Sequence, residues 1–242
     1  MGYDGTATLG PMFDSPLPAV AVALPGTGSD ADFARRAFGP ACAARGLDLI
    51  AVEPDPAGVV DSYLAALDTA AEQGPVLAAG ISLGAAVALE WAAARPAAAV
   101  GVIAALPAWT GPDTADCPAA LSAAITAVQL RADGLESVIE RMRANSPRWL
   151  GDALTQSWRS QWPQLPAALE EAAAYKWPDP QQLDTLEVPL AVVTAVDDPV
   201  HPLEVAQEWA QRAPCSSLTH LRLDELGADP AVLGRAGLAW FR

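Results

Sequence analysis

The segment Gly80-Ile81-Ser82-Leu83-Gly84 has the residue types and spacing of a serine nucleophile. Residues 75–79 before it are apolar and predict a buried strand, while residues 85–92 after it are helix formers. The glycines permit a tight strand-to-helix turn that lifts the serine hydroxyl clear of the sheet edge. The following helix also points its unpaired N–H groups at this place. The pattern G-x-S-x-G occurs by chance as well, but a strand before it and a helix after it favour a functional serine.

Two aspartates, Asp197 and Asp198, follow a second apolar run at residues 190–194. A serine hydroxyl is a weak nucleophile, and acyl transfer needs a base beside it and a carboxylate that orients the base. Either aspartate could supply that carboxylate. Both could instead cap the helix that we expect to begin at Pro202.

The chain contains two histidines, His201 and His220, and neither has an obvious place beside the serine. His220 lies inside a predicted strand, roughly 10 Å below the edge where the serine emerges, so it is expected to be a packed strand residue. His201 lies at the correct edge, but only three residues after Asp198. We expect so short a connection to make it awkward for His201 to sit between Asp198 and Ser82.

The elements that must position these residues alternate along the chain. Apolar runs predict strands, and amphipathic stretches between them predict helices, which indicates a mostly parallel sheet with helices on both faces. Residues 1–17 are rich in glycine and proline and predict an edge strand or an extended arm. The expected strands are residues 19–24, 47–52, 75–79, 100–106, 190–194 and 218–223, and the expected helices are 30–45, 59–73, 85–95, 202–212 and 229–241.

The alternation is interrupted between about Pro107 and Leu186 by a stretch with helical patterns. This stretch contains five of the eight tryptophans, namely Trp109, Trp149, Trp158, Trp162 and Trp177. It is also the most basic part of the chain, with Arg131, Arg141, Arg143, Arg148 and Arg159.

From about Ala19 onward the chain resembles the α/β-hydrolase superfamily. The resemblance is carried by the elbow at residues 80–84, by the loop Leu24-Pro25-Gly26-Thr27-Gly28, and by the segment from Ala195 to Pro202. It implies an α/β-hydrolase fold with a core of residues 1–106 and 187–242 and an inserted helical cap of residues 107–186. It also implies hydrolysis through a Ser-Asp-His triad, with Ser82 as the nucleophile and no cofactor or metal.

The resemblance also assigns the other site residues. The oxyanion hole is expected from the backbone N–H groups of Leu83 and Thr27. The family's acid stands directly before a proline, which favours Asp198 over Asp197. A phosphate-binding role for the loop after residue 24 is the alternative, but the spacing of its glycines fits neither a dinucleotide site nor a P-loop.

The sequence departs from the family at the histidine. The family commonly has Gly-His after its last strand, where this chain has Gly227 and Ala228. We therefore expect the base position at Ala228 to be vacant. An engineered His-to-Ala change fits best, because the elbow, the loop and the acid are intact; a natural relative that lost classical hydrolysis is the other explanation. A hydrolase-fold protein that only binds a small molecule is the alternative from a different class.

The composition narrows the possible partners and location. Of 242 residues, 52% are hydrophobic and 18% are charged, which is typical of a compact globular protein. A net charge of −15 argues against nucleic acid and anionic membranes as partners. No stretch predicts a membrane span or a signal peptide, and Cys42, Cys117 and Cys215 lack metal-type spacing, so we expect a cytoplasmic protein with buried thiols.

The residues of the expected cap suggest the substrate class. Its tryptophans and its apolar residues offer a large contact area, which predicts packing of cap on core and a pocket for a small apolar or aromatic molecule. The cap arginines leave an anionic substrate open. The bond type, whether ester, thioester, lactone or carbon–carbon, does not follow from the sequence, but Ser82 in place of an aspartate argues against haloalkane and epoxide chemistry.

Overall fold

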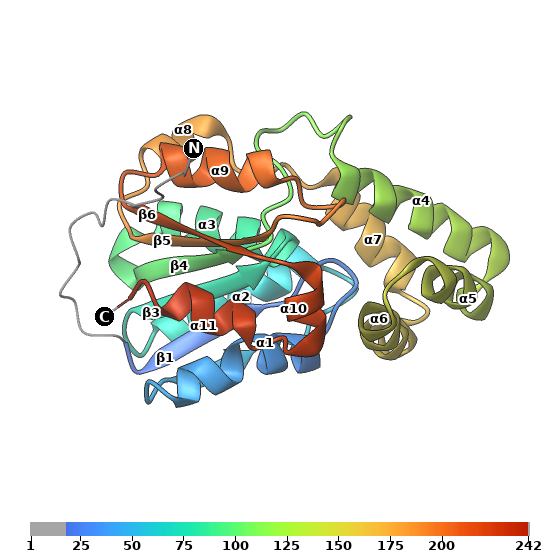
Figure 1. Ribbon diagram of the computed structural model, residues 1–242, viewed down its shortest axis with the longest axis horizontal. Helices are drawn as coiled ribbons and strands as arrows, with labels where there is room; N and C mark the ends of the chain where they lie inside the picture. Colours follow the sequence, from blue (N-terminus) through green and yellow to red (C-terminus); the bar gives the residue numbers. More distant parts are fainter. Residues whose placement is uncertain (1–17, 242) are drawn as a thin grey trace, which may run out of the picture.

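Six parallel strands form the centre of the part of the chain that the structure describes. The computed structural model describes residues 18–241, so the arm expected at residues 1–17 lies outside the described residues. The strands pair in the order β2-β1-β3-β4-β5-β6 (Figure 1). Their bounds are β1 Val20–Leu24, β2 Asp48–Ala51, β3 Val76–Ile81, β4 Ala99–Ala105, β5 Leu190–Ala195 and β6 Ser216–Leu221.

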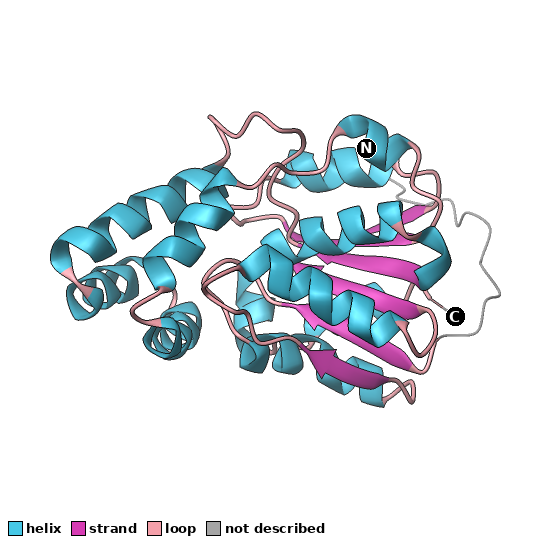
Figure 2. Ribbon diagram, turned by 180° about the vertical axis from the view of Figure 1, so that it is seen from behind, coloured by secondary structure: helices cyan, strands magenta, loops and turns pink. Residues whose placement is uncertain are grey.

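Helices cover both faces of this sheet, as Figure 2 shows from behind. Helices α1 (Ala31–Ala43) and α11 (Val232–Leu238) pack on one face, where strand residues such as Ala21 and Ala23 point. Helices α2 (Val59–Ala71), α3 (Leu83–Ala94) and α9 (Leu203–Arg212) pack on the other face, together with the alternate strand residues. The predicted fold class is confirmed.

Strands β3, β4 and β5 each have a neighbouring strand on both sides and are almost entirely buried. Strands covered by helices on both faces read as continuous apolar runs, which is why the sequence pattern predicted them. Ser82 directly follows β3, and Asp198 follows β5 after a short turn. The two residues therefore emerge at the same edge of the sheet, near its centre.

The chain between β4 and β5 contains five helices. Helices α4 to α7 lie together to one side of the sheet, whereas α8 lies beside α9 (Figure 1). The group α4 to α7, which we call the cap, has its own small core that includes Leu130, Ile139, Trp158 and Leu165. The bounds are α4 Pro118–Asp133, α5 Leu135–Asn145, α6 Arg148–Gln161, α7 Leu165–Ala174 and α8 Pro180–Asp184.

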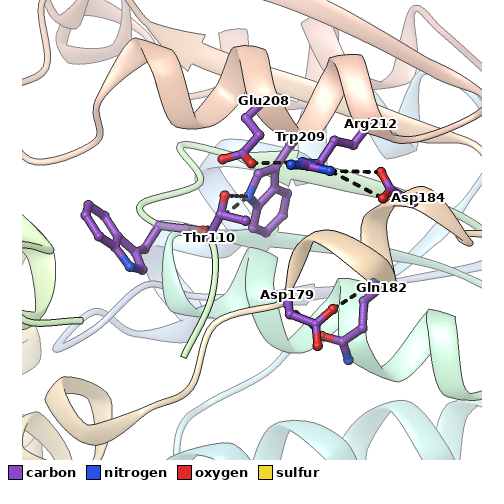
Figure 3. Close-up of polar contacts among 8 residues, drawn as sticks. Thr110, Asp179, Gln182, Asp184, Glu208, Trp209 and Arg212 are labelled. Atoms are coloured by element: carbon purple, nitrogen blue, oxygen red, sulfur yellow. Dashed lines mark hydrogen bonds and ion pairs between the residues drawn. The ribbon is translucent and has the colours of Figure 1, made fainter. Parts of the chain in front are cut away.

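Both ends of this insertion are attached to α9 (Figure 3). The indole N–H of Trp209 donates to the Trp109 carbonyl and to the Thr110 hydroxyl, each at 3.1 Å. Arg212 pairs with Asp184 of α8 at 3.2 Å. Since α9 directly follows the loop of Asp198, these contacts help to fix where that loop ends.

The C-terminal part differs from the sequence-based expectation. Strand β6 ends at Leu221, and the stretch that was predicted to be a loop forms helix α10 (Leu223–Ala228). Two side chains cap its start: Asp197 accepts from the N–H of Leu223 at 2.8 Å, and Glu225 accepts from the N–H of Arg222 at 2.8 Å. The predicted loop is wrong because these two carboxylates satisfy the free N–H groups of a helix start.

Candidate active site

Ser82 occupies a strained turn between β3 and α3. Its backbone has φ 53° and ψ −115°, and its N–H donates to the Ala105 carbonyl at 2.9 Å. Few non-glycine residues adopt a positive φ, and when they do so at a site the strain is usually functional. A Cβ on Gly80 would lie 2.1 Å from the Gly84 carbonyl oxygen, and a Cβ on Gly84 would lie 2.4 Å from that of Leu24. Both elbow glycines are therefore required by close backbone contact.

An imidazole contacts the Ser82 hydroxyl, and it belongs to His201. The distance from His201 Nε2 to Ser82 Oγ is 3.0 Å, and the distance from His201 Nδ1 to Asp198 Oδ2 is 2.7 Å. The expectation that the short connection from Asp198 would keep His201 from sitting between Asp198 and Ser82 is therefore wrong. Serine, imidazole and carboxylate are within hydrogen-bond distance in the order that nucleophilic catalysis requires.

A turn at Asp198 makes this arrangement possible. Asp198 Oδ1 accepts from the N–H groups of Val200 at 2.8 Å and His201 at 3.3 Å. An aspartate that bonds the backbone two residues on folds the chain back upon itself. The imidazole thereby returns over the other carboxylate oxygen. Sequence reasoning judged the connection by its length and missed this turn, although the Asp-x-x-His spacing after a strand was a readable signal.

The carboxylate of Asp198 is buried, and it is hydrogen-bonded to two backbone N–H groups and to the imidazole of His201. Its side chain is only 8% exposed, and burial alone would raise its pKa. The hydrogen bond from His201 and those from the two backbone N–H groups outweigh burial, so the pKa of Asp198 lies below its ordinary value. An ionised Asp198 favours the tautomer with hydrogen on Nδ1, which leaves Nε2 free to accept the serine proton.

The remaining candidates from the sequence have other surroundings. Asp197 caps α10 and pairs with Arg222 at 3.1 Å, so Asp198 is the aspartate that contacts the imidazole. His220 lies on β6 as expected, but it is exposed, so the expectation of a packed residue is wrong: β6 is an edge strand of the sheet. Ala228 is the last residue of α10, and the contacts expected of an imidazole there are made by His201 instead.

The loop after β1 lies against the elbow. A Cβ on Gly26 would be 3.5 Å from the Cβ of Ser82. Residues 26–29 form a turn in which the Ser29 N–H donates to the Gly26 carbonyl at 3.0 Å, and Gly28 has φ 68°. Neither Thr27 N–H nor Leu83 N–H donates a hydrogen bond to another described residue. Both predicted oxyanion donors therefore have N–H groups without a hydrogen-bond partner among the described residues.

Within residues 18–241, no group of three or more His, Cys, Asp or Glu side chains could hold a metal ion. No helix in the same range has the length and apolarity needed to cross a bilayer.

Comparisons with known proteins agree with this architecture. Residues 3–233 match the model of the Alpha/beta hydrolase family. Among solved structures, BpoC of Mycobacterium tuberculosis H37Rv, assigned as a non-heme bromoperoxidase, has a TM-score of 0.69 at 18% identity, with 93% of this chain and 92% of that chain covered. A hydrolase from Pseudomonas aeruginosa PA01 has a TM-score of 0.67 at 20% identity, covering 91% and 89%.

A third solved structure, a thermophilic esterase from Thermogutta terrifontis, has a TM-score of 0.65 at 18% identity, covering 90% of this chain and 87% of that chain. At such identities these structures show a shared fold alone. No curated protein matches the sequence.

Proposed function

Since the chain belongs to the alpha/beta hydrolase family, we propose that it is a serine hydrolase that cleaves an ester, thioester or lactone of a small apolar molecule. The observation that carries the proposal is the pair of contacts made by His201, at 3.0 Å to Ser82 Oγ and 2.7 Å to Asp198 Oδ2. With this imidazole in place, the triad needs no histidine at position 228.

The proposed reaction has two halves. Nε2 of His201 accepts the hydroxyl proton while Ser82 Oγ attacks the substrate carbonyl, and the oxygen of that carbonyl becomes negative. The N–H groups of Thr27 and Leu83 donate to this oxygen. The imidazolium, stabilised by Asp198, then gives its proton to the leaving group. Water repeats the steps on the acyl-serine and releases the acid.

Surface ion pairs argue for an uncharged substrate. Each of the five cap arginines pairs with a carboxylate, namely Arg131 with Glu170, Arg141 with Asp133, Arg143 and Arg148 with Asp152, and Arg159 with Glu136. The cationic charge of the cap is thus compensated within the protein itself. The cap arginines therefore give no reason to propose an anionic substrate. A substrate with a small apolar acyl or alcohol group is the better proposal.

The cap tryptophans serve mainly to seat the cap on the core. Trp149 stacks on Phe33 of α1 with 6.2 Å between ring centroids. Trp158 is buried against Gly28 and the cap core. Trp162 is 40% exposed. The bound substrate is proposed to lie where the cap meets Ser82. Few of these tryptophan rings are needed to contact a substrate at that place.

A fluorophosphonate reagent tests the assignment of nucleophile and base. It should label the unmodified chain rapidly and at Ser82, because His201 activates that hydroxyl. The variant His201→Ala should label more slowly by about 10³-fold or more, since loss of a triad base removes that activation. Ala228→His is the matched control and should leave the rate unchanged. Labelling rates and the modified residue are read by mass spectrometry.

Two results would contradict this proposal. Slow labelling of the unmodified chain that becomes fast in Ala228→His would restore the vacant-base hypothesis. Absence of labelling in both forms, with the fold intact, would favour a protein that binds a small molecule without turning it over.

A further inference from the structure

Helix α6 of the cap reaches the turn at residues 26–29 through two buried polar side chains. The Ser157 hydroxyl donates to the Gly28 carbonyl at 2.7 Å, and Gln161 Nε2 donates to the Ser29 carbonyl at 2.9 Å. Gln161 Nε2 also contacts Ser157 Oγ at 2.8 Å. Ser157 is 1% exposed and Gln161 is 3% exposed.

Burial of these two side chains needs a reason. A buried hydroxyl or amide destabilises a protein unless it is hydrogen-bonded, and an apolar pair would pack in the same place without that requirement. Their next neighbour on α6, Trp158, belongs to the apolar core of the cap. Ser157 and Gln161 are therefore polar because of what they face, which is the backbone carbonyls of the turn.

The turn lies between the cap and the elbow. On the cap side, a Cβ on Gly28 would be 2.9 Å from Trp158 Nε1, so α6 sits directly on the turn. On the core side, Gly26 packs on Ser82, and the Tyr63 hydroxyl donates to the Pro25 carbonyl at 3.0 Å. Helix α6 therefore contacts the turn on the side opposite Ser82, where it opposes movement of the turn away from the serine.

We propose that Ser157 and Gln161 are positioning residues that hold the turn so that the Thr27 N–H faces the oxygen that becomes negative. They touch the backbone of the turn and act on the reaction through Thr27. The inference rests on the proposed function. Catalytic donors must be held to within about 0.5 Å, and hydrogen bonds from the surrounding residues provide that precision.

The test separates positioning from simple support. Gln161→Met keeps the side-chain length but cannot donate, Ser157→Ala removes the hydroxyl, and Ser157→Thr retains it. Arg159→Met on the same helix is the matched control, because Arg159 is exposed and pairs with Glu136. For each variant, kcat and KM are measured with p-nitrophenyl acetate, together with inhibition by phenylboronic acid, whose adduct on Ser82 places a negative oxygen in the oxyanion hole.

The double variant Ser157→Ala/Gln161→Met should lose about 10- to 100-fold in kcat, with KM within about threefold of the original value. Phenylboronic acid should bind more weakly by a similar factor. Arg159→Met and Ser157→Thr should resemble the unmodified chain. Gln161→Glu, which keeps the shape and replaces the donor by an acceptor, should show the same loss if the double variant does not fold.

Three outcomes overturn the inference. An active chain whose double variant keeps its kcat and its boronic acid affinity refutes positioning but leaves the proposed function standing. A rise in KM with kcat unchanged also refutes it, because the two side chains would then only support substrate binding. If the unmodified chain neither hydrolyses the ester nor reacts with fluorophosphonate, the proposed function fails and this inference fails with it.

Discussion

The elbow of Ser82 and the loop of Asp198 and His201 lie at the same edge of the sheet but are held by different kinds of contact. The elbow is fixed by backbone against backbone, since Gly80 and Gly84 leave no space for a Cβ. The loop is fixed by side-chain hydrogen bonds. The Asp198 carboxylate accepts from two backbone N–H groups and contacts the imidazole of His201.

This difference separates stability from activity. A change in the elbow disturbs the packing of β3 and α3, on which the centre of the sheet depends. A change in the loop can remove one hydrogen bond and leave the surrounding backbone in place. We therefore expect substitutions in the elbow to lower mainly the stability of the fold, and substitutions in the loop to lower mainly the activity.

The largest expected effect is a loss of activity from a change in the loop that leaves the fold intact. Asp198→Asn keeps an oxygen that can accept from Val200 and His201 but loses the charge that orients the imidazole. Its kcat for p-nitrophenyl acetate should fall roughly 10³- to 10⁴-fold, as when the wrong tautomer is held. Asp197→Asn is the matched control and should keep most of the activity, since Asp197 caps α10. Equal losses in both variants would contradict the assignment of Asp198.

The same variant should change how stability depends on pH. The pKa of Asp198 is lowered in the folded protein, so the stability that its charge contributes is present above the unfolded pKa of about 3.9. That contribution is lost as the pH falls through the lower folded value. Urea unfolding at a series of pH values below 5 should show a smaller acid-induced loss in Asp198→Asn than in the unmodified chain.

The next effect concerns the elbow. Gly80→Ala would place a Cβ 2.1 Å from the Gly84 carbonyl oxygen, and neither backbone can move without disturbing its strand or helix. We expect the free energy of unfolding to fall by about 3 kcal/mol or more. Gly46→Ala is a useful comparison, because Gly46 has a positive φ of 69° but no atom within 4 Å of the added Cβ, so its loss reflects backbone strain without close packing. Equal losses of the two variants in urea unfolding would contradict the claim that close packing at Gly80 causes the larger loss.

The smallest effect lies on α3, two turns beyond the elbow glycines. Burial raises the pKa of Glu90, although hydrogen bonds from Tyr175 and Gln182 oppose this rise. The charge of Glu90 therefore reduces stability as the pH increases from the unfolded pKa of about 4.3 toward the higher folded value. Glu90→Gln should raise the free energy of unfolding at pH 7 by at most about 0.5 kcal/mol, because solvent screens a partly exposed charge. Activity should not change.

Backbone-determined features were readable in the sequence. The parallel sheet, the elbow and the turn after β1 depend on apolar runs and on glycines that no other residue can replace at Gly80 and Gly84. Such requirements leave a fixed pattern of residue types. The alternation of strands and helices was predicted for the same reason, with errors of a few residues at the ends of elements.

Features determined by side-chain hydrogen bonds were not readable in the same way. The position of His201 depends on the turn made by Asp198, and helix α10 depends on a cap supplied by Asp197, 26 residues earlier in the chain. Neither contact imposes a residue pattern as distinctive as that of the elbow. The expectation of a vacant base at Ala228 followed from a family's usual position for the histidine, which this chain does not use.

Because Asp198 and His201 are only three residues apart, the protein can be split into two fragments without separating the acid from the base. Ser82, Asp198 and His201 all precede β6, so every chemical group of the triad is encoded before residue 202. The segment from β6 to α11 contributes the edge strand, apolar residues such as Leu233 and Leu238, and the Leu223 N–H that donates a hydrogen bond to Asp197. The connection between α9 and β6 is thus a natural break point for a two-fragment reporter, in which reassembly of the fold would switch on a reaction whose chemistry resides in one piece.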